Sequence, residues 1–219
     1  LRHGLSSPPM IHVSACASGT DAIGSAFLAI QDGQLDVVLA GGADSMINPM
    51  GLGGFAKLGA LSQRNDSPST ASRPFDENRD GFVMGDGAGF IVLEEEESAR
   101  KRGTTILAKI SGYGNSMDAY SISDPHPDGA GAVMAMQTAI KSAGLKPYDI
   151  SALSAHGTST SKNDPAETAA IRALFGPHAM DDSVFATKSM IGHLISAAGA
   201  VETVAAIQCL RRQELHQTL

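Results

Sequence analysis

The chain has 219 residues, of which 42% are hydrophobic and 18% are charged, and its formal net charge is −7 at pH 7. That length suffices for one large domain or two small ones with a substantial core. The acidic balance argues against a nucleic-acid partner, because nucleic-acid binders usually carry basic patches, and no apolar run reaches the roughly 18–20 residues that a membrane span needs.

Two cysteines, Cys16 and Cys209, lie far apart in the sequence. They form neither a disulfide framework nor a CxxC spacing typical of zinc, so we expect no metal site and a reducing compartment. Neither a signal-peptide pattern nor an Arg-rich leader is present. We therefore expect a cytoplasmic protein, or an organellar one in a eukaryote. The chain begins at Leu1 and ends without a turn signal, which suggests a piece of a longer protein.

Apolar spacing and turn residues predict the elements of the first part of the chain. Apolar residues at helical spacing follow Asp21 and stop near Gly33, a favourable C-cap. The apolar run after Asp36 has the pattern of a buried strand. In chain order we expect a strand over 10–15, a helix over 21–33, a strand over 36–44, loops and short helices over 45–80, one bent or two short strands over 81–95, and a short helix over 95–103.

The pattern restarts in the second part of the chain. The expected elements are a strand over 106–114, a helix over 131–144, a strand over 150–158, a helix over 163–176, a strand over 183–189 and a helix over 194–212. Alternating helices and apolar strands predict an α/β protein with a parallel or mixed sheet. The layout on either side of residue 104 is loosely similar.

Cys16 follows the first predicted strand at the start of a helix, in the segment VSACASG. Unpaired N–H groups and the helix dipole at such a position are expected to stabilise a thiolate. The small neighbours Ala15, Ala17 and Gly19 leave room for an incoming group. A nucleophile and a buried structural cysteine are both compatible with this segment.

Two histidines lie just beyond predicted strands, His156 in AHGTST and His193 in KSMIGHL. Ligands gather at the carboxyl ends of strands in open α/β sheets, so both histidines and Cys16 could share a site. Each histidine alone could equally be a core or loop residue. A helix N-terminus disfavours positive charge, so we expect His193 to be neutral.

Other residues have both a functional and a structural interpretation. Lys188, Asp164 and Glu167 could form an ionic support near the histidines, or could be solvated residues at helix starts. Phe55 could line an apolar pocket or simply pack in the core. The glycine cluster at 85–89 matches neither nucleotide-binding fingerprint, so we assign it to turns and close packing.

Five segments together resemble one known family: VSACASG, AGGAD, RPFDENRDGFVMGDGAG, AHGTST and KSMIGHLISAAGAVE. The chain is similar to the elongating β-ketoacyl-acyl-carrier-protein synthases of fatty-acid and polyketide assembly. The resemblance implies a thiolase-like layered αβαβα fold, with 1–104 as the latter part of the N-terminal half and 105–219 as the first part of the C-terminal half. It implies decarboxylative condensation of a malonyl unit with an acyl group.

The resemblance also implies roles for individual residues. Cys16 is the expected acyl-accepting nucleophile, and His156 and His193 act on the malonyl unit. The remaining implied roles are support of the site by Lys188, Asp164, Glu167 and Glu202, contact with the carrier's phosphopantetheine arm by Thr158 and Thr160, and lining of the acyl pocket by Phe55. The implied partner is acyl carrier protein, with no cofactor of the chain's own and a homodimer formed through the strand at 10–15.

The sequence departs from the family at three places. Relatives are longer, with earlier strands before the region matched here and a GFGGTN-like loop after it, and DAYSIS at 118–123 replaces the DAYHMT of bacterial members. Two other functions stay open. One is a thiolase-like acyltransferase that does not decarboxylate, and the other is a non-catalytic partner subunit, although such subunits lack the nucleophile.

Overall fold

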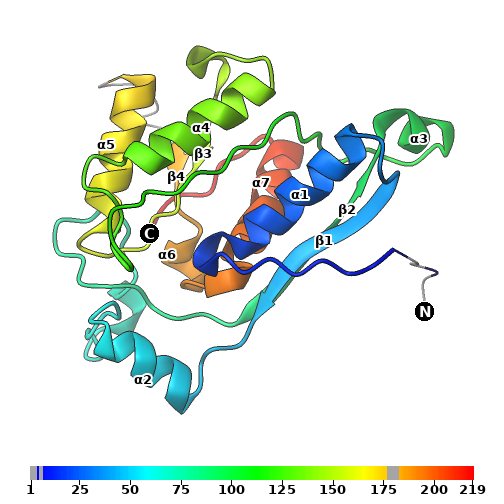
Figure 1. Ribbon diagram of the computed structural model, residues 1–219. Coiled ribbons are helices and arrows are strands. Elements are labelled where there is room, and N and C mark those ends of the chain that lie inside the picture. Colours follow the sequence, from blue (N-terminus) through cyan, green and yellow to red (C-terminus); the bar gives the residue numbers. More distant parts are fainter. Residues whose placement is uncertain (1–3, 5–6, 177–182) are drawn as a thin grey trace.

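The computed structural model describes residues 4, 7–176 and 183–219 (Figure 1). The described helices are α1 (Ser18–Gln31), α2 (Pro49–Lys57), α3 (Glu96–Lys101), α4 (Ala130–Ser142), α5 (Asn163–Phe175), α6 (Lys188–Ile191) and α7 (Ala198–Arg212). Short 3-10 helices are η1 (Ala15–Ala17), η2 (Pro68–Thr70), η3 (Pro147–Asp149) and η4 (Ile195–Ala197). The strands are β1 (Val37–Asp44), β2 (Gly87–Glu94), β3 (Leu153–Ser154) and β4 (Val184–Phe185).

The larger sheet is an antiparallel pair, β1 with β2, in register from Val37 opposite Glu94 to Asp44 opposite Gly87. Helices α1 and α7 lie side by side and both contact this pair (Figure 1). Small and aliphatic side chains fill the contact, because alternate residues of a strand face the same side. The buried cluster there comprises Ile23, Ala26, Ala40 and Ala200, with Val38, Ile91, Leu93 and Ile110 against it.

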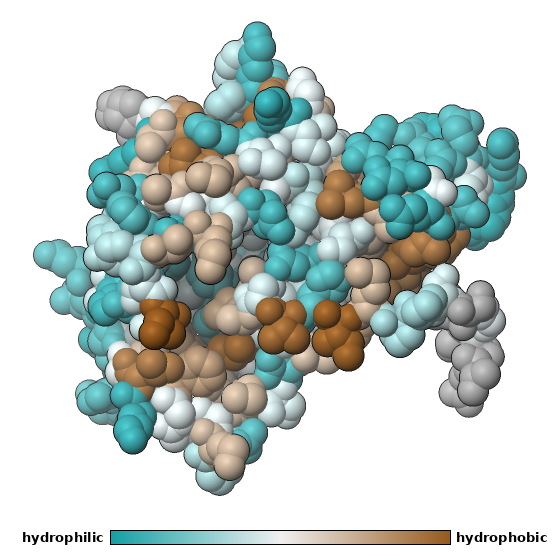
Figure 2. Space-filling view, viewed as in Figure 1, coloured by the Kyte–Doolittle hydropathy of each residue, from teal (hydrophilic) through white to brown (hydrophobic). Residues whose placement is uncertain are grey.

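The opposite face of the β1–β2 pair is exposed. Leu39 and Val92 are cross-strand partners on that face, and their exposed fractions are 52% and 66%. Phe90 on the same strand is 54% exposed. Hydrophobic surface is visible beside the hydrophilic end of the molecule that carries α3 (Figure 2). An apolar sheet face of this kind normally packs against another layer.

The second sheet is a short parallel pair, with Leu153 opposite Val184 and Ser154 opposite Phe185. Helix α5 follows β3 and contacts α4 (Figure 1). The α/β class is therefore predicted correctly, whereas the described strands form one antiparallel and one parallel pair rather than a single parallel or mixed sheet. The expected strands over 150–158 and 183–189 are right in place and too long, because only two residue pairs meet and residues from Lys188 onward turn into α6.

Two expected strands are wrong. Within the described part of the chain, residues 10–15 and 106–114 pair with no strand. Met10, Ile11 and Val13 are exposed to 74%, 87% and 90%. β-propensity produces a strand only where a neighbouring strand accepts its backbone hydrogen bonds, and the described residues offer none there.

The helices were predicted more accurately than the strands. Every expected helix is present within a few residues of its predicted bounds, except that η4 occupies the start of the last one. The expected strand or strands over 81–95 become β2, preceded by isolated bridges from Phe82 to Leu61 and from Met84 to His193. No helix among the described residues is both long enough and apolar enough to cross a membrane.

Candidate active site

Cys16 lies in η1, immediately before α1. Ala15 has φ of 50°, a left-handed conformation that turns the chain sharply before the thiol. The Ser18 hydroxyl fixes the turn: it donates to the Ala15 carbonyl at 2.7 Å and accepts from the Ser14 N–H at 3.0 Å. Cys16 is half-buried while Ala15 and Ala17 are exposed, so the thiol is presented at an open corner.

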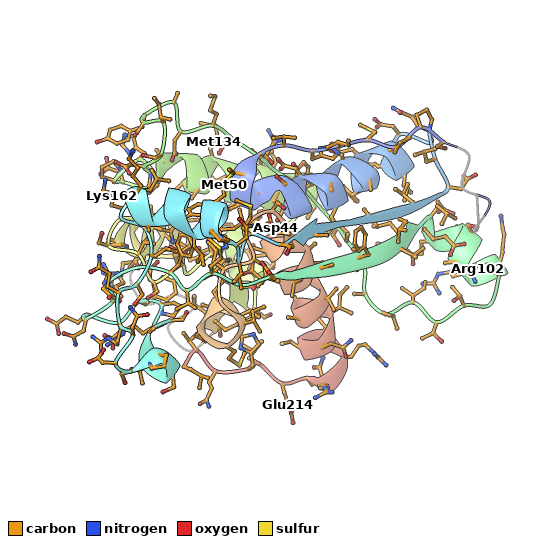
Figure 3. All side chains as sticks on the ribbon, turned by 90° about the horizontal axis from the view of Figure 1, so that it is seen from below. Asp44, Met50, Arg102, Met134, Lys162 and Glu214 are labelled. Carbon is orange, nitrogen blue, oxygen red and sulfur yellow. The ribbon has the colours of Figure 1, made fainter. Side chains whose placement is uncertain are left out.

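The glycine after this turn allows two helices to approach closely. A Cβ on Gly19 would lie 2.9 Å from the Ala200 nitrogen and 2.9 Å from the Ser196 carbonyl oxygen. Asp44, labelled in Figure 3 at the end of β1, accepts from the Ser196 N–H at 3.0 Å and from its hydroxyl at 2.6 Å. These contacts fix η4 against β1 and α1, which places the loop before η4 beside Cys16.

The thiol and both histidines meet at this place. The Cys16 Sγ lies 3.1 Å from the His193 Nε2. The His156 and His193 rings are edge to face, with centroids 5.3 Å apart. One nitrogen of each ring and the Cys16 Sγ all lie within 4.8 Å of one another. The structure therefore brings these three predicted residues together.

The hydrogen bonds of His193 identify its tautomer. Its Nδ1 accepts the Ile195 N–H at 3.1 Å, so in the neutral ring the proton is on Nε2, which faces Cys16. Burial lowers the pKa of His193 to about 3, and the charge of Lys188 acts in the same direction. His193 is thus neutral as predicted, but burial rather than a helix terminus is the main cause.

His156 has the same tautomer for a different reason. Its Nδ1 lies 3.2 Å from the Lys188 Nζ, and an ammonium can only donate. The His156 proton is therefore on Nε2 in the neutral ring. Burial lowers the pKa of His156 well below its usual value, with Lys188 and His193 adding to the effect.

Lys188 and Glu202 form a buried ion pair behind the histidines. The Lys188 Nζ lies 2.5 Å from the Glu202 Oε1, and Lys188 is 2% exposed. Burial raises the pKa of the Glu202 carboxyl, and the charge of Lys188 opposes that rise. A buried lysine needs such a partner, because an unpaired charge in this environment is costly.

Asp164 and Glu167 do not pair with Lys188 among the described residues, which corrects the expectation that they belong to its ionic support. Asp164 is 1% exposed and accepts the N–H groups of Thr158 at 3.1 Å, Ser159 at 3.1 Å and Phe75 at 2.8 Å. It therefore shapes the loop after His156 and connects that loop to residue 75.

Glu167 binds the same loop, at the residues just before those bound by Asp164. Its two carboxylate oxygens accept the His156 N–H at 2.6 Å and the Gly157 N–H at 2.8 Å. Burial raises the pKa of Glu167, whereas these hydrogen bonds lower it. The two carboxylates thus fix the backbone that presents His156, and the cation nearest to Asp164 is Arg79, whose Nε lies 3.9 Å from its Oδ2.

Thr158, Thr160 and Phe55 lie near the site in two groups. The Thr158 and Thr160 hydroxyls are 2.9 Å apart, and Thr158 is buried. Phe55 packs edge to face on Phe82 at 5.4 Å between centroids, in a cluster that includes Cys16. Phe82 in turn lies 5.1 Å from the His193 ring. An apolar wall therefore extends from Phe55 to the thiol.

The thiol differs from the expectation in its ionisation. Burial raises the pKa of Cys16 above its usual value, while the charge of Lys188 and the backbone N–H of Cys16 itself lower it. The free thiol is therefore mainly protonated at neutral pH. Burial disfavours the charged form of any group, and here it outweighs the stabilisation expected at a helix N-terminus.

Three contributors to the site have no signal in the sequence. The Ile195 N–H sets the His193 tautomer, Phe82 packs on that ring, and Asp44 fixes η4. A backbone N–H has no sequence signature. Asp44 was visible only as the end of a strand in the AGGAD segment.

Comparisons with known proteins identify the family of this chain. The family model of the β-ketoacyl synthase N-terminal domain matches residues 1–99, and that of the C-terminal domain matches residues 107–219. A 3-oxoacyl-acyl-carrier-protein synthase 2 of Synechocystis sp. is 46% identical over 99% of this chain and 52% of its own length. A chloroplastic 3-oxoacyl-acyl-carrier-protein synthase II of Arabidopsis thaliana is 48% identical over 94% of this chain and 38% of its own length.

A solved complex of a type II PKS acyl-carrier protein with its ketosynthase bound to the hexaketide has the same fold. It matches with a TM-score of 0.96 at 37% identity, over 99% of this chain and 53% of that chain. The predicted thiolase-like ketosynthase fold is thus confirmed, as a partial fold, since the chain spans about half the length of the curated relative from Synechocystis. The chain belongs to the β-ketoacyl synthase family.

Proposed function

We propose that the complete protein catalyses decarboxylative condensation of malonyl-acyl-carrier protein with an acyl group held on Cys16. The products are 3-oxoacyl-acyl-carrier protein and CO2, in fatty-acid or polyketide synthesis. The observation that carries this proposal is the meeting of one thiol with two neutral Nε2–H donors, from His156 and His193. Membership of the β-ketoacyl synthase family supports the same reaction class.

In the first step the Cys16 sulfur attacks the acyl thioester on the carrier's phosphopantetheine arm. A new C–S bond forms as the bond to the pantetheine sulfur breaks, and the thiol proton ends on the departing pantetheine thiol. Because Nδ1 of His193 accepts the Ile195 N–H, His193 donates to the sulfur rather than removing its proton. Its Nε2–H stabilises the thiolate that burial disfavours.

In the second step the malonyl carboxylate leaves as CO2, and its bonding electrons form an enolate. Negative charge develops on the malonyl thioester oxygen. The His156 and His193 Nε2–H groups are positioned to donate to that oxygen without changing protonation state. A single donor of this kind typically contributes about 2.7–4 kcal/mol to the transition state.

In the third step the enolate carbon attacks the acyl thioester on Cys16. The new C–C bond forms, the bond to Sγ breaks, and the thiolate takes a proton from solvent. Backbone N–H groups of η1 and of the first turn of α1, including that of Cys16 in η1, are suited to hold the oxyanion of this step, because the first N–H groups of a helix have no partner within it.

The two halves of the chain have separate tasks in this proposal. Residues 1–104 supply Cys16, and residues 105–219 supply both histidines; the two matched family models support a boundary between 99 and 107. Thr158 and Thr160 contact the phosphopantetheine arm, and Phe55 lines the acyl pocket. The pair Lys188–Glu202 holds His156, while Asp164 and Glu167 shape the loop that presents it.

Acyl carrier protein is the proposed partner, and its phosphopantetheine arm is the only prosthetic group the reaction needs. We also propose a homodimer through residues 10–15, whose apolar side chains are exposed in the single chain. Light scattering of the complete protein at micromolar concentration should give twice the monomer mass. We propose a cytoplasmic or organellar location, with neither nucleic acid nor membrane as a partner.

The presence of Cys16 beside His193 argues against a non-catalytic partner subunit. A thiolase-like acyltransferase usually employs a second cysteine, and Cys209 lies on α7 outside the group formed by Cys16 and the two histidines. Decarboxylative condensation accounts for both histidines and needs one thiol.

The test is covalent acylation of the complete protein by acyl-acyl-carrier protein, measured by intact mass. The wild type and the control Cys209→Ala should each gain one acyl group, and Cys16→Ala should gain none. Acylation of Cys16→Ala, or a wild type that never acylates while its carrier is competent, would refute the proposal.

A further inference from the structure

The three reacting groups have the composition of a zinc site. A thiol and two imidazoles, with their ligand atoms within 4.8 Å of one another, match the three-ligand sets of catalytic zinc centres. Bond lengths of about 2.0–2.3 Å separate the ligands of tetrahedral zinc by roughly 3.3–3.7 Å. The 3.1 Å between the Cys16 Sγ and the His193 Nε2 is close to that separation.

The groups that contact the outer nitrogens of the two rings are hydrogen-bond donors, whereas a metal site has acceptors there. A histidine that binds a metal through one nitrogen donates the N–H of the other to an acceptor, usually a carboxylate or a carbonyl. Here the outer nitrogens face donors instead. The His193 Nδ1 faces the Ile195 N–H at 3.1 Å, and the His156 Nδ1 faces the Lys188 Nζ at 3.2 Å.

We propose that Lys188 and the Ile195 N–H protect the Cys16–His156–His193 cluster from capture by Zn2+ and other thiophilic divalent cations. Because Nδ1 of each ring faces a donor, both rings carry their proton on Nε2, the nitrogen left for the cluster, where a metal would need a lone pair. If the proton moved to Nδ1, the Nδ1–H of His193 would point at the Ile195 N–H, and the Nδ1–H of His156 would point at the Lys188 ammonium.

The surroundings prevent the rings from escaping this arrangement. The Ile195 donor belongs to the backbone at the start of η4, and the η4 residue Ser196 is bound to Asp44. Lys188 is held by Glu202, and His193 is 2% exposed and packed against Phe82. A soft, largely buried ligand set thus keeps its N–H donors available for substrate.

The protection arises from the direction of the hydrogen bonds rather than from repulsion by a cation. Lys188 is paired with Glu202, so the pair adds little net charge beside the cluster. Removing the charges of Lys188 and Glu202 together leaves the net charge unchanged, so a change in metal binding would then come from the hydrogen bond to His156 and not from electrostatic repulsion. The variant Lys188→Gln with Glu202→Gln keeps the net charge and provides an amide oxygen that can accept a proton from His156 Nδ1.

The experiment measures Co2+ binding to the complete protein without substrate, by the thiolate-to-cobalt absorption band, and Zn2+ by competition. We expect no Cys16-dependent band in the wild type. The double variant should bind Co2+ at least about tenfold more tightly, the lower end of effects seen when groups behind metal-bound histidines are changed. Adding Cys16→Ser should abolish that binding.

Two controls accompany the double variant. Lys188→Arg keeps a donor and a charge and should resemble the wild type. Lys162→Gln removes an exposed lysine that pairs with Asp124, and should also change nothing. A wild type with a band that Cys16→Ser removes, or a folded double variant that binds no more tightly, contradicts the proposal.

A second measurement needs no variant at all. In wild-type protein labelled with 15N-histidine, NMR should show an unprotonated Nδ1 and a protonated Nε2 for both rings; either ring with the reverse tautomer contradicts the proposal. Metal binding and tautomers are both read without turnover, so this inference and the proposed condensation can fail separately.

Discussion

The Tyr113 hydroxyl donates a hydrogen bond to the Asp21 Oδ1 at 2.6 Å, across 92 residues of sequence. Asp21 is in the first turn of α1, and its other oxygen accepts the Ser14 hydroxyl two residues before Cys16. Tyr113 also fits over Gly24, where a Cβ would overlap its ring. A residue matched by the C-terminal family model thus holds the helix that follows Cys16.

Tyr113→Phe removes this hydrogen bond and keeps the ring. Hydrogen bonds to charged groups contribute about 1.5–3 kcal/mol, so we expect a loss of that order in the free energy of unfolding. Urea denaturation of the complete protein measures it. Tyr148→Phe, at an exposed position, is the control and should change little. Equal stability of the two variants would show that the hydroxyl has no such role.

Tyr113 also predicts a pH dependence of stability. Burial, followed by the hydrogen bond and the charge of Asp21, raises its pKa to about 12 from 10.0. The unfolded chain then loses this proton at lower pH than the folded one, so stability is constant below about pH 10 and falls as pH rises towards about 12. Denaturation midpoints across that range should fall less in Tyr113→Phe than in the wild type.

The proposed division of labour predicts two opposite defects. Cys16→Ala removes the nucleophile and leaves both Nε2–H donors, so acylation and condensation should stop while some decarboxylation of malonyl carrier persists. His193→Ala should still acylate, and its decarboxylation should fall by about 10²–10³ because one oxyanion donor is lost. CO2 release and acyl-enzyme mass measure the two activities separately. Normal decarboxylation by His193→Ala would show that its Nε2–H is not used.

The rate at which Cys16 reacts with an alkylating reagent should increase with pH up to an unusually high pH. Alkylation by iodoacetamide follows the thiolate fraction, and burial raises the pKa of Cys16 above 9.0. The alkylation rate should therefore still be increasing above about pH 9. Lys188→Met should shift the profile to higher pH, because the charge of Lys188 lowers this pKa. A plateau below pH 8 in the wild type would contradict the burial argument.

Asp164→Asn should destabilise the loop that presents His156. One Asp164 oxygen accepts the N–H groups of Phe75 and Ser159. In the asparagine variant an NH2 group at that place would point at these two donors and could not accept from them. We expect a loss of about 1–3 kcal/mol in unfolding free energy, the cost of buried groups left without partners. Thermal unfolding measures it against Asp128→Asn, an exposed control; equal melting temperatures would contradict the role.

The apolar face of the β1–β2 pair predicts how the isolated 219-residue chain behaves. Leu39, Phe90 and Val92 are all at least half exposed, and surfaces of this kind promote association. We expect strong binding of an apolar dye and concentration-dependent aggregation, both reduced in Leu39→Lys with Val92→Glu. A monodisperse wild-type chain without dye binding would show that this face is tolerated in water.

The cluster of Cys16, His156 and His193 was predictable because its members follow local rules. Cys16, His156 and His193 each come directly after a predicted strand or at a turn marked by small residues, and the family motifs surround all three. Helices such as α1 and α5 were predictable for the same reason, since periodicity and capping act within a few residues.

The tertiary structure alone decided what the site residues do to one another. The tautomer of His193 depends on a backbone N–H at Ile195, and the partners of Asp164 include an N–H 89 residues away. Residues 10–15 have a strand-like sequence but no described strand beside them. Propensity and motif spacing are local properties, whereas protonation, strand pairing and burial depend on which distant groups become neighbours.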